Sequence, residues 1–157
     1  MTLAGAEVLI YPTAIGWDPE DTPEEQQRQL DAWITIQRSH AVANGIPVIS
    51  CNRIGFEPAP DSATGITFWG NSFIAGPQGE IITQANASEI NLLTGTLDSS
   101  RIERVRQIWP YLRDRRIDAY GDLSKRFIDW QAVEIRLSNA FGLCGHPSII
   151  FILQRHA

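Results

Sequence analysis

The chain has 157 residues, 43% of them hydrophobic and 20% charged, which is typical of one globular domain. Its formal net charge of −5 gives no basic field, so we expect no nucleic-acid partner. No apolar run reaches the roughly 20 residues of a membrane helix and no signal peptide is recognisable, so we expect no membrane partner. Two cysteines, Cys51 and Cys144, are too few for a disulfide framework, which favours a cytoplasmic location.

The first predicted strand and the loop after it are expected to organise the fold. Residues 8–11, with the sequence VLIY, form a short apolar run that stops at Pro12. Such a run predicts a central strand that is buried on both faces. Ligands of layered α/β proteins bind at the loop that follows such a strand, so Thr13 and Ala14 are predicted to face a ligand. A plain strand-to-helix turn is the alternative.

Capping signals mark the next helix. Thr22 can cap its start, Pro23 suits the first helical position and Glu25 completes a capping box. Asn44-Gly45 predicts its end. Gly5 predicts the end of an earlier helix whose start is missing, and a short N-terminal cap is the alternative. The residues expected on the buried face of the long helix are Leu30, Trp33, Ile34, Gln37 and Ala41.

The remaining elements are predicted to be mostly strands. The expected strands are residues 46–51, 68–75, 80–84 and 90–97. Residues 76–79 are expected to form a hairpin turn, whereas proline and glycine predict an irregular loop over residues 52–65. Residues 98–100 are predicted to cap a helix over about residues 101–108. Residues 111–127 are expected to form an extended, arginine-rich arm.

Three strings resemble a known family. They are YPTAIGWDP at residues 11–19, HAVANGIPVISCNRIG at residues 40–55 and FWGNSFIAGPQGEII at residues 68–82. These strings closely resemble the carbon–nitrogen hydrolase (nitrilase) superfamily, and within it the enzymes that hydrolyse N-carbamoylputrescine. The resemblance makes residues 1–127 the C-terminal portion of such a domain. Residues 128–157 form an atypical tail, for which we consider disorder or a frame change.

The resemblance implies an α-β-β-α sandwich, so the expected fold class is α/β, a partial nitrilase-type sandwich that lacks its N-terminal half. It also implies a cysteine that attacks the carbamoyl carbon, a glutamate that acts as general base and a lysine that stabilises the oxyanion, without a cofactor. In the family these three groups precede the strand that opens this chain. We therefore assign no catalytic residue and expect the chain to be inactive alone. A fragment without function and a subunit that binds full-length protomers are the alternatives.

Neither cysteine is predicted to be a nucleophile. A reactive thiol needs a base or a positive field, and His40 on the preceding helix has no evident route to Cys51. We interpret Cys51 as a small apolar residue at a strand end. Cys144 and His146 are sequence neighbours, which rarely gives the geometry of a dyad. Two cysteines and three histidines show no metal-ligand spacing, so no metal site is predicted.

The substrate that the resemblance implies is a small carbamoyl amine whose far end carries an ammonium group. A carboxylate or aromatic faces would recognise that group. Glu57 is predicted to supply the carboxylate, with Asn52 beside it, and Arg53 to fix the loop or pair with an acid. The candidate aromatic residues are Trp17, Phe56 and Trp69. The alternatives are a solvated Glu57 and a Trp69 in the sheet core.

The arm combines aromatic and basic residues of the kinds that are enriched at interfaces. They are Trp109, Tyr111, Arg113, Arg115 and Arg116. Because the resemblance implies subunit contact through such arms, we expect a homo-oligomer; a solvated segment is the alternative. Strand edges and apolar faces that lack their partners predict poor solubility for the chain alone.

Overall fold

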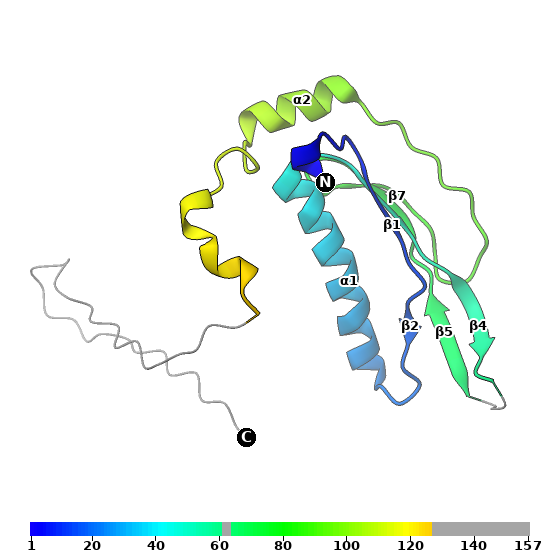
Figure 1. Cartoon of the computed structure of the whole chain (residues 1–157). Helices are drawn as coiled ribbons and strands as arrows, with labels where there is room; N and C mark the ends of the chain where they lie inside the picture. Colours follow the sequence, from blue (N-terminus) through cyan, green and yellow to red (C-terminus); the bar gives the residue numbers. More distant parts are fainter. Residues whose placement is uncertain (61–63, 127–157) are drawn as a thin grey trace, which may run out of the picture. The chain divides into compact units, whose positions relative to one another are not determined.

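The computed structural model describes residues 1–60 and 64–126, and the chain divides into two units, residues 1–116 and 117–157. The strands of the first unit are β1 (Leu9–Pro12), β2 (Gly16–Trp17), β3 (Val48–Cys51), β4 (Ile54–Pro58), β5 (Gly65–Trp69), β6 (Phe73–Ala75) and β7 (Ile81–Gln84). Its helices are the 3-10 helix η1 (Thr2–Ala4), α1 (Pro23–Asn44) and α2 (Ser99–Ile108) (Figure 1). The tail, residues 128–157, lies outside the described residues.

Helix α1 begins and ends where the sequence predicts. The Thr22 hydroxyl accepts a hydrogen bond from the Glu25 backbone N–H at 3.3 Å, and Pro23 is the first helical residue. Gly45 ends the helix at φ 62°, a left-handed conformation that suits glycine. The Glu25 carboxylate lies 2.8 Å from Arg28 on the helix surface. Local capping chemistry therefore sets both ends of this helix.

A four-stranded sheet with the order β1-β3-β6-β7 lies beside helix α1 (Figure 1). β1 and β3 are parallel, and the other two pairs are antiparallel. Because alternate residues of a strand share a face, Val48, Phe73 and Ala75 lie together, and each is 0% exposed. Leu9 of β1, Ile46 and Ala41 of α1 also belong to this apolar core. Trp33 and Ile34 of α1 pack against it, which confirms the predicted buried face of the helix.

The prediction that the first strand is central and buried on both faces is wrong. Within the described residues, β1 has one neighbour, β3, and lies at an edge of the sheet. Leu9 faces the core at 6% exposed, whereas Ile10 on the opposite face is 60% exposed. An apolar run favours a strand, but the neighbours that cover its two faces come from other parts of the structure.

The strand predicted over residues 68–75 is instead two strands in different sheets. β5 lies in a three-stranded sheet of order β2-β5-β4, whereas β6 lies in the four-stranded sheet. Gly70 and Asn71, which separate them, have φ angles of 57° and 56°. Two successive left-handed residues turn the chain out of one sheet and into the other. The Asn71 side chain donates to the Trp69 carbonyl at 2.6 Å and braces this turn.

The loop predicted over residues 52–65 contains strand β4, so that prediction is also wrong. β4 pairs with β5 in an antiparallel hairpin, with Phe56 opposite Thr67 and Glu57 opposite Ile66. Gly65 permits the close approach, because a Cβ there would lie 2.3 Å from the Glu57 carbonyl oxygen. The hairpin ladder outweighs the breaker residues that had suggested a loop.

The β6–β7 hairpin and its turn follow the prediction, but residues 90–97 do not form a strand. Ile90 and Leu92 are 94% and 91% exposed, so their apolar side chains have no sheet face to cover. Further along, Gly95 packs closely on the sheet: a Cβ there would lie 3.2 Å from Ile74 and 3.3 Å from Ile82. This segment therefore crosses β6 and β7 without pairing with them.

Helix α2 starts at Ser99, slightly earlier than predicted, and Asp98 caps it. The Asp98 carboxylate accepts hydrogen bonds from the backbone N–H groups of Ser100 and Arg101 at 2.9 and 3.2 Å. Gly5 ends η1 at φ 91°, as expected of a helix end.

The expected extended arm is not extended. Its first part is a turn in which Trp109 and Tyr111 stack at 5.8 Å and Arg113 pairs with Asp114 at 2.7 Å. In the second unit, residues 117–126 contain two 3-10 helices, η2 (Ile117–Ala119) and η3 (Gly121–Ser124). Local hydrogen bonds, such as Arg115 Nε to the Leu112 carbonyl at 2.6 Å, replace the extended form.

Candidate functional site

Three loops cross between the two sheets at one place. β1 leads to β2 through residues 13–15, β3 leads to β4 through residues 52–53, and β5 leads to β6 through residues 70–72. The strands have different neighbours on the two sides of the crossing. In the four-stranded sheet β3 lies between β1 and β6, whereas in the three-stranded sheet β5 lies between β2 and β4. The carboxyl ends of the parallel strands β1 and β3 meet at this crossing, the edge at which ligands bind in layered α/β proteins.

Asn52 joins the three loops through its side chain. Its Oδ1 accepts hydrogen bonds from the Thr13 hydroxyl and the Ile15 backbone N–H, both at 3.0 Å. Its Nδ2 donates to the Ile15 carbonyl at 3.0 Å and to the Gly70 carbonyl at 3.1 Å. The Asn52 backbone N–H donates to the Ser72 hydroxyl at 2.9 Å. Every donor and acceptor position of this side chain is used, and its predicted substrate contact stays a prediction.

Ala14 is the open residue of the first loop. Thr13 on one side donates its backbone N–H to the Cys51 carbonyl at 2.8 Å, and Ile15 on the other side is held by Asn52. The Ala14 peptide groups make no hydrogen bond within the described part of the chain, and the residue is exposed. The structure thus leaves one accessible peptide between two fixed ones.

A groove of about 260 Å³ opens beside the crossing. Its polar lining includes Asn52, Ser72, Asn86, Glu89 and Asn91. Ser72 and Asn86 are missing from the predicted site. The sequence signal for Ser72 was its place directly after Gly70-Asn71. These two residues favour a turn, which would have ended the strand predicted over residues 68–75 before Ser72.

Glu57 lies on β4 rather than on a loop, and its carboxylate pairs with Arg53 at 2.5 Å. Both side chains are about half exposed, at 54% and 53%. The Arg53 guanidinium lies 4.2 Å above the centre of the Phe68 ring, which holds it against β5. The expectation that Arg53 pairs with an acid is confirmed. Its partner is Glu57, the residue that is predicted to bind the ammonium group of the substrate.

Trp69 is part of the core. It is 2% exposed, with its ring 4.8 Å from that of Trp17 and 5.9 Å from that of Trp33 on α1. The structure therefore brings Thr13, Ala14 and Asn52 together at the crossing, whereas Trp69, the last residue of β5, buries its side chain in the core. Phe56, another candidate aromatic residue, is 57% exposed on β4.

Cys51 lies at the end of β3, as the sequence predicts, and its side chain is exposed. Its thiol makes no hydrogen bond within the described residues, and His40 stacks on Tyr11 at 6.1 Å instead. Within the same residues, no three His, Cys, Asp or Glu side chains group as metal ligands would. Cys144 and His146 lie outside the described residues.

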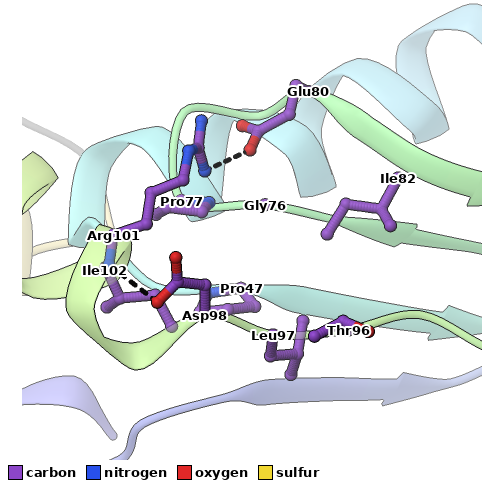
Figure 2. A pocket seen from close by; sticks show the side chains of 10 residues that line it. All are labelled: Pro47, Gly76, Pro77, Glu80, Ile82, Thr96, Leu97, Asp98, Arg101 and Ile102. Atoms are coloured by element: carbon purple, nitrogen blue, oxygen red, sulfur yellow. Dashed lines mark hydrogen bonds and ion pairs between the residues drawn. The ribbon is translucent and has the colours of Figure 1, made fainter.

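A second hollow, of about 320 Å³, lies between the β6–β7 turn and the start of α2 (Figure 2). Arg101 and Glu80 form an ion pair across it at 2.5 Å, and the pair is about 40% exposed. Arg101 also donates to the Gln78 side chain at 3.0 Å. Because Arg101 and Glu80 already pair with each other, we interpret this pair as a structural contact between α2 and the β6–β7 hairpin.

Comparison with known proteins identifies the family. The sequence model of the carbon–nitrogen hydrolase family matches residues 1–107. The chain belongs to this family. Over 122 residues it is 43% identical to N-carbamoylputrescine amidase from Oryza sativa subsp. japonica, a match that covers 76% of this chain and 40% of that protein. Over 127 residues it is 37% identical to citrullinase from Francisella tularensis, a match that covers 81% of this chain and 43% of that protein.

The solved structure of a carbon–nitrogen hydrolase from Helicobacter pylori G27 superimposes with a TM-score of 0.77 at 54% identity. The match covers 82% of this chain and 44% of that one. This similarity confirms the predicted α/β, nitrilase-type fold class and its partial character. This carbon–nitrogen hydrolase chain spans about two-fifths of the length of the curated relatives it matches, at 40% for the first of them. Among its described residues, none of the helices has the length and apolar character needed to cross a bilayer.

Proposed function

We propose that this chain forms the substrate-facing part of a hydrolase that converts N-carbamoylputrescine to putrescine, carbon dioxide and ammonia in polyamine biosynthesis. Similarity of 43% to N-carbamoylputrescine amidases from several plants supports the substrate. The observation that carries the proposal is the open Ala14 peptide at the loop crossing. A ureido group offers both a carbonyl acceptor and N–H donors, and one peptide offers the matching donor and acceptor.

The chain alone does not complete the reaction. The resemblance requires a cysteine, a glutamate and a lysine that act together on the carbamoyl carbon. Among the described residues, the Cys51 thiol has no hydrogen-bonded base, and Lys125, the one lysine of the sequence, pairs with Asp122 in the second unit. We therefore propose that the 157 residues hold substrate and that the reacting groups come from residues outside them.

Glu57 is proposed to receive the ammonium end of the substrate. Its carboxylate is half exposed, so an ammonium group can reach it from solvent even though it already pairs with Arg53. The gain is modest, because exposed ion pairs are each worth up to about 1 kcal/mol.

Citrulline is the second candidate substrate, because it ends in the same ureido group and also carries a carboxylate. The half-exposed Arg53 beside Glu57 offers a guanidinium for that carboxylate. The 37% identity to a citrullinase agrees with this alternative.

A homo-oligomer is the proposed assembly, in the cytoplasm, with contacts from the segment around Trp109 and Tyr111. These stacked rings are 50% and 48% exposed, and Arg113 follows them in the sequence, which is the composition of an interface. The alternative partner is a full-length protomer of the same family, and measurement of mass after mixing the two would distinguish them.

Binding measurements test the proposed substrate. N-carbamoylputrescine, citrulline and butylurea share the ureido group and differ at the far end, so their affinities for the full chain separate the contributions of the two ends. We expect N-carbamoylputrescine to bind more tightly than butylurea, and Glu57→Gln to remove that difference. Butylurea binding as tightly as N-carbamoylputrescine would count against Glu57, and tighter binding of citrulline would favour the second candidate.

An assay of ammonia release tests the absence of turnover. The chain alone should release no more ammonia from N-carbamoylputrescine than buffer does. Turnover that Cys51→Ser abolishes would overturn this part of the proposal and restore Cys51 as a nucleophile.

A further inference from the structure

Asn52 is in an unusual position relative to the β1–β3 ladder. In this ladder, every second residue of the first strand forms hydrogen bonds with β3. The Leu9 N–H donates to the Pro47 carbonyl at 3.0 Å, and the Thr13 N–H donates to the Cys51 carbonyl at 2.8 Å. Beyond Cys51, β3 offers no further backbone partner to this strand, because the chain turns towards β4. Ile15 is the next residue of the series. The Asn52 side chain bonds to both of its peptide groups, and the Ile15 carbonyl also accepts a hydrogen bond from the Trp69 backbone N–H at 3.4 Å.

A side-chain amide that accepts from one residue's N–H and donates to the same residue's carbonyl imitates a neighbouring strand residue. Asn52 therefore extends the ladder by one step with its side chain. Since successive residues of an extended chain direct their peptide groups to opposite sides, Ala14 then faces away from β3. That side is the edge of β1, where no strand pairs with it among the described residues.

We propose that Asn52 is a positioning residue: it clamps the Ile15 peptide so that the Ala14 peptide is presented at the open edge of β1, where it pairs with the ureido group of a substrate. The ligand in this statement rests on the proposed function. The clamp itself rests on geometry alone.

The clamp also ties the first loop to the third. Nδ2 of Asn52 donates to the Gly70 carbonyl, and the Asn52 and Ser72 residues exchange two further bonds, N–H to hydroxyl at 2.9 Å and hydroxyl to carbonyl at 3.3 Å. Gly70 itself donates its N–H to the Arg53 carbonyl at 3.0 Å. The left-handed turn that moves the chain between sheets is thus fixed to the same side chain, which limits how far Ala14 can move.

Amide hydrogen exchange, read by NMR on the full chain, tests the clamp without any ligand. In the unaltered chain the Ile15 amide should exchange more slowly than the Ala14 amide. In Asn52→Leu, which keeps the approximate size, removes the four side-chain hydrogen bonds and retains the backbone bonds to Ser72, Ile15 exchange should rise about tenfold. Equal exchange of the two amides before substitution would overturn the clamp, whatever the variant does.

Asn52→Asp gives a readout that a purely structural residue would not move. The carboxylate keeps both accepted bonds and loses both donated ones, leaving it against the carbonyls of Ile15 and Gly70. Protonation restores one donor, so the Ala14 signal and ligand binding should return towards those of the unaltered chain as acid protonates the new carboxylate. Asn44→Asp is the control, because it adds the same charge outside this groove, at the end of α1, where the Asn44 side chain bonds to the His40 carbonyl at 2.8 Å.

Titration with N-carbamoylputrescine then separates the two proposals. We expect the Thr13 and Ala14 signals to shift in the unaltered chain and in Asn44→Asp, and not in Asn52→Leu. Slow Ile15 exchange without any ligand-induced shift would keep the clamp and refute its role in substrate binding. Ligand shifts that survive Asn52→Leu unchanged would refute Asn52 as a positioning residue even if the proposed substrate is right.

Discussion

The two faces of the four-stranded sheet have similar composition and opposite surroundings. On the face towards α1, Val48, Phe73 and Ala75 are 0% exposed. On the other face, Ile10 is 60% and Ile82 40% exposed, although Ile74 between them is 8% exposed beneath Gly95. The comparison shows that apolar residues alone do not make a core: one face has a 22-residue helix against it, and the other has a crossing segment over part of its area.

Truncation of Phe73 should have the largest effect on stability. Phe73→Ala removes a ring that packs edge-on against Trp33 at 6.0 Å, and we expect a loss of roughly 3–5 kcal/mol in the free energy of unfolding. Ile10→Ala, the matched change on the open face, should cost about 0.5 kcal/mol or less. Urea denaturation measures both. Similar losses for the two variants would show that the open face is covered in solution.

A charge on the open face should change association more than stability. Ile10→Glu breaks an exposed apolar surface at an edge strand, so we expect a larger monomer fraction in analytical ultracentrifugation and better solubility. Ile36→Glu, on the surface of α1 at 53% exposed, is the control for added charge. If both variants dissociate the protein equally, net charge rather than this face governs association.

The helix that covers the packed face can be weakened from its end. Thr22→Ala removes the hydroxyl that accepts from Glu25 N–H and should cost about 1 kcal/mol of stability. Thr35→Ala, at an exposed position inside α1, is the control and should be neutral or slightly stabilising, since alanine has the higher helix propensity. Thermal melts compare the two, and an equal loss would argue against the cap.

The smallest effect on stability is expected at the ion pair Arg113–Asp114, which is exposed to solvent and belongs to neither face of the sheet. The hydrogen bond from Arg113 lowers the pKa of the Asp114 carboxyl. A lowered pKa in the folded state means that the contribution is present above the ordinary pKa and is lost as the pH falls through the lowered value. Asp114→Asn should therefore leave the melting temperature at neutral pH nearly unchanged and remove a small part of its decline in acid. A large loss at neutral pH would be inconsistent with a solvent-screened pair.

The candidate site was partly predictable. Thr13, Ala14 and Asn52 follow strands whose apolar runs are visible in the sequence, and parallel strands bring their ends together. The roles were not predictable, because Asn52 bonds to Ile15 across 37 positions of sequence and Glu57 pairs with Arg53 only once β4 is formed. Trp69 could equally have lined a pocket, and the packing of Trp17 and Trp33 against it decided for the core.

The sequence by itself determined the features that depend on neighbours within a few residues. Thr22, Pro23 and Gly45 set the ends of α1, and Asp98 caps α2, because a cap satisfies backbone groups only a turn away. Only the tertiary structure decided which strands pair and which faces are covered. β4 forms because it pairs with β5. The run from Phe68 to Ala75 divides into two strands because its first part pairs in the three-stranded sheet and its last part in the four-stranded sheet. Strand pairing joins segments that are distant in the sequence, and a local pattern does not specify which segments will pair.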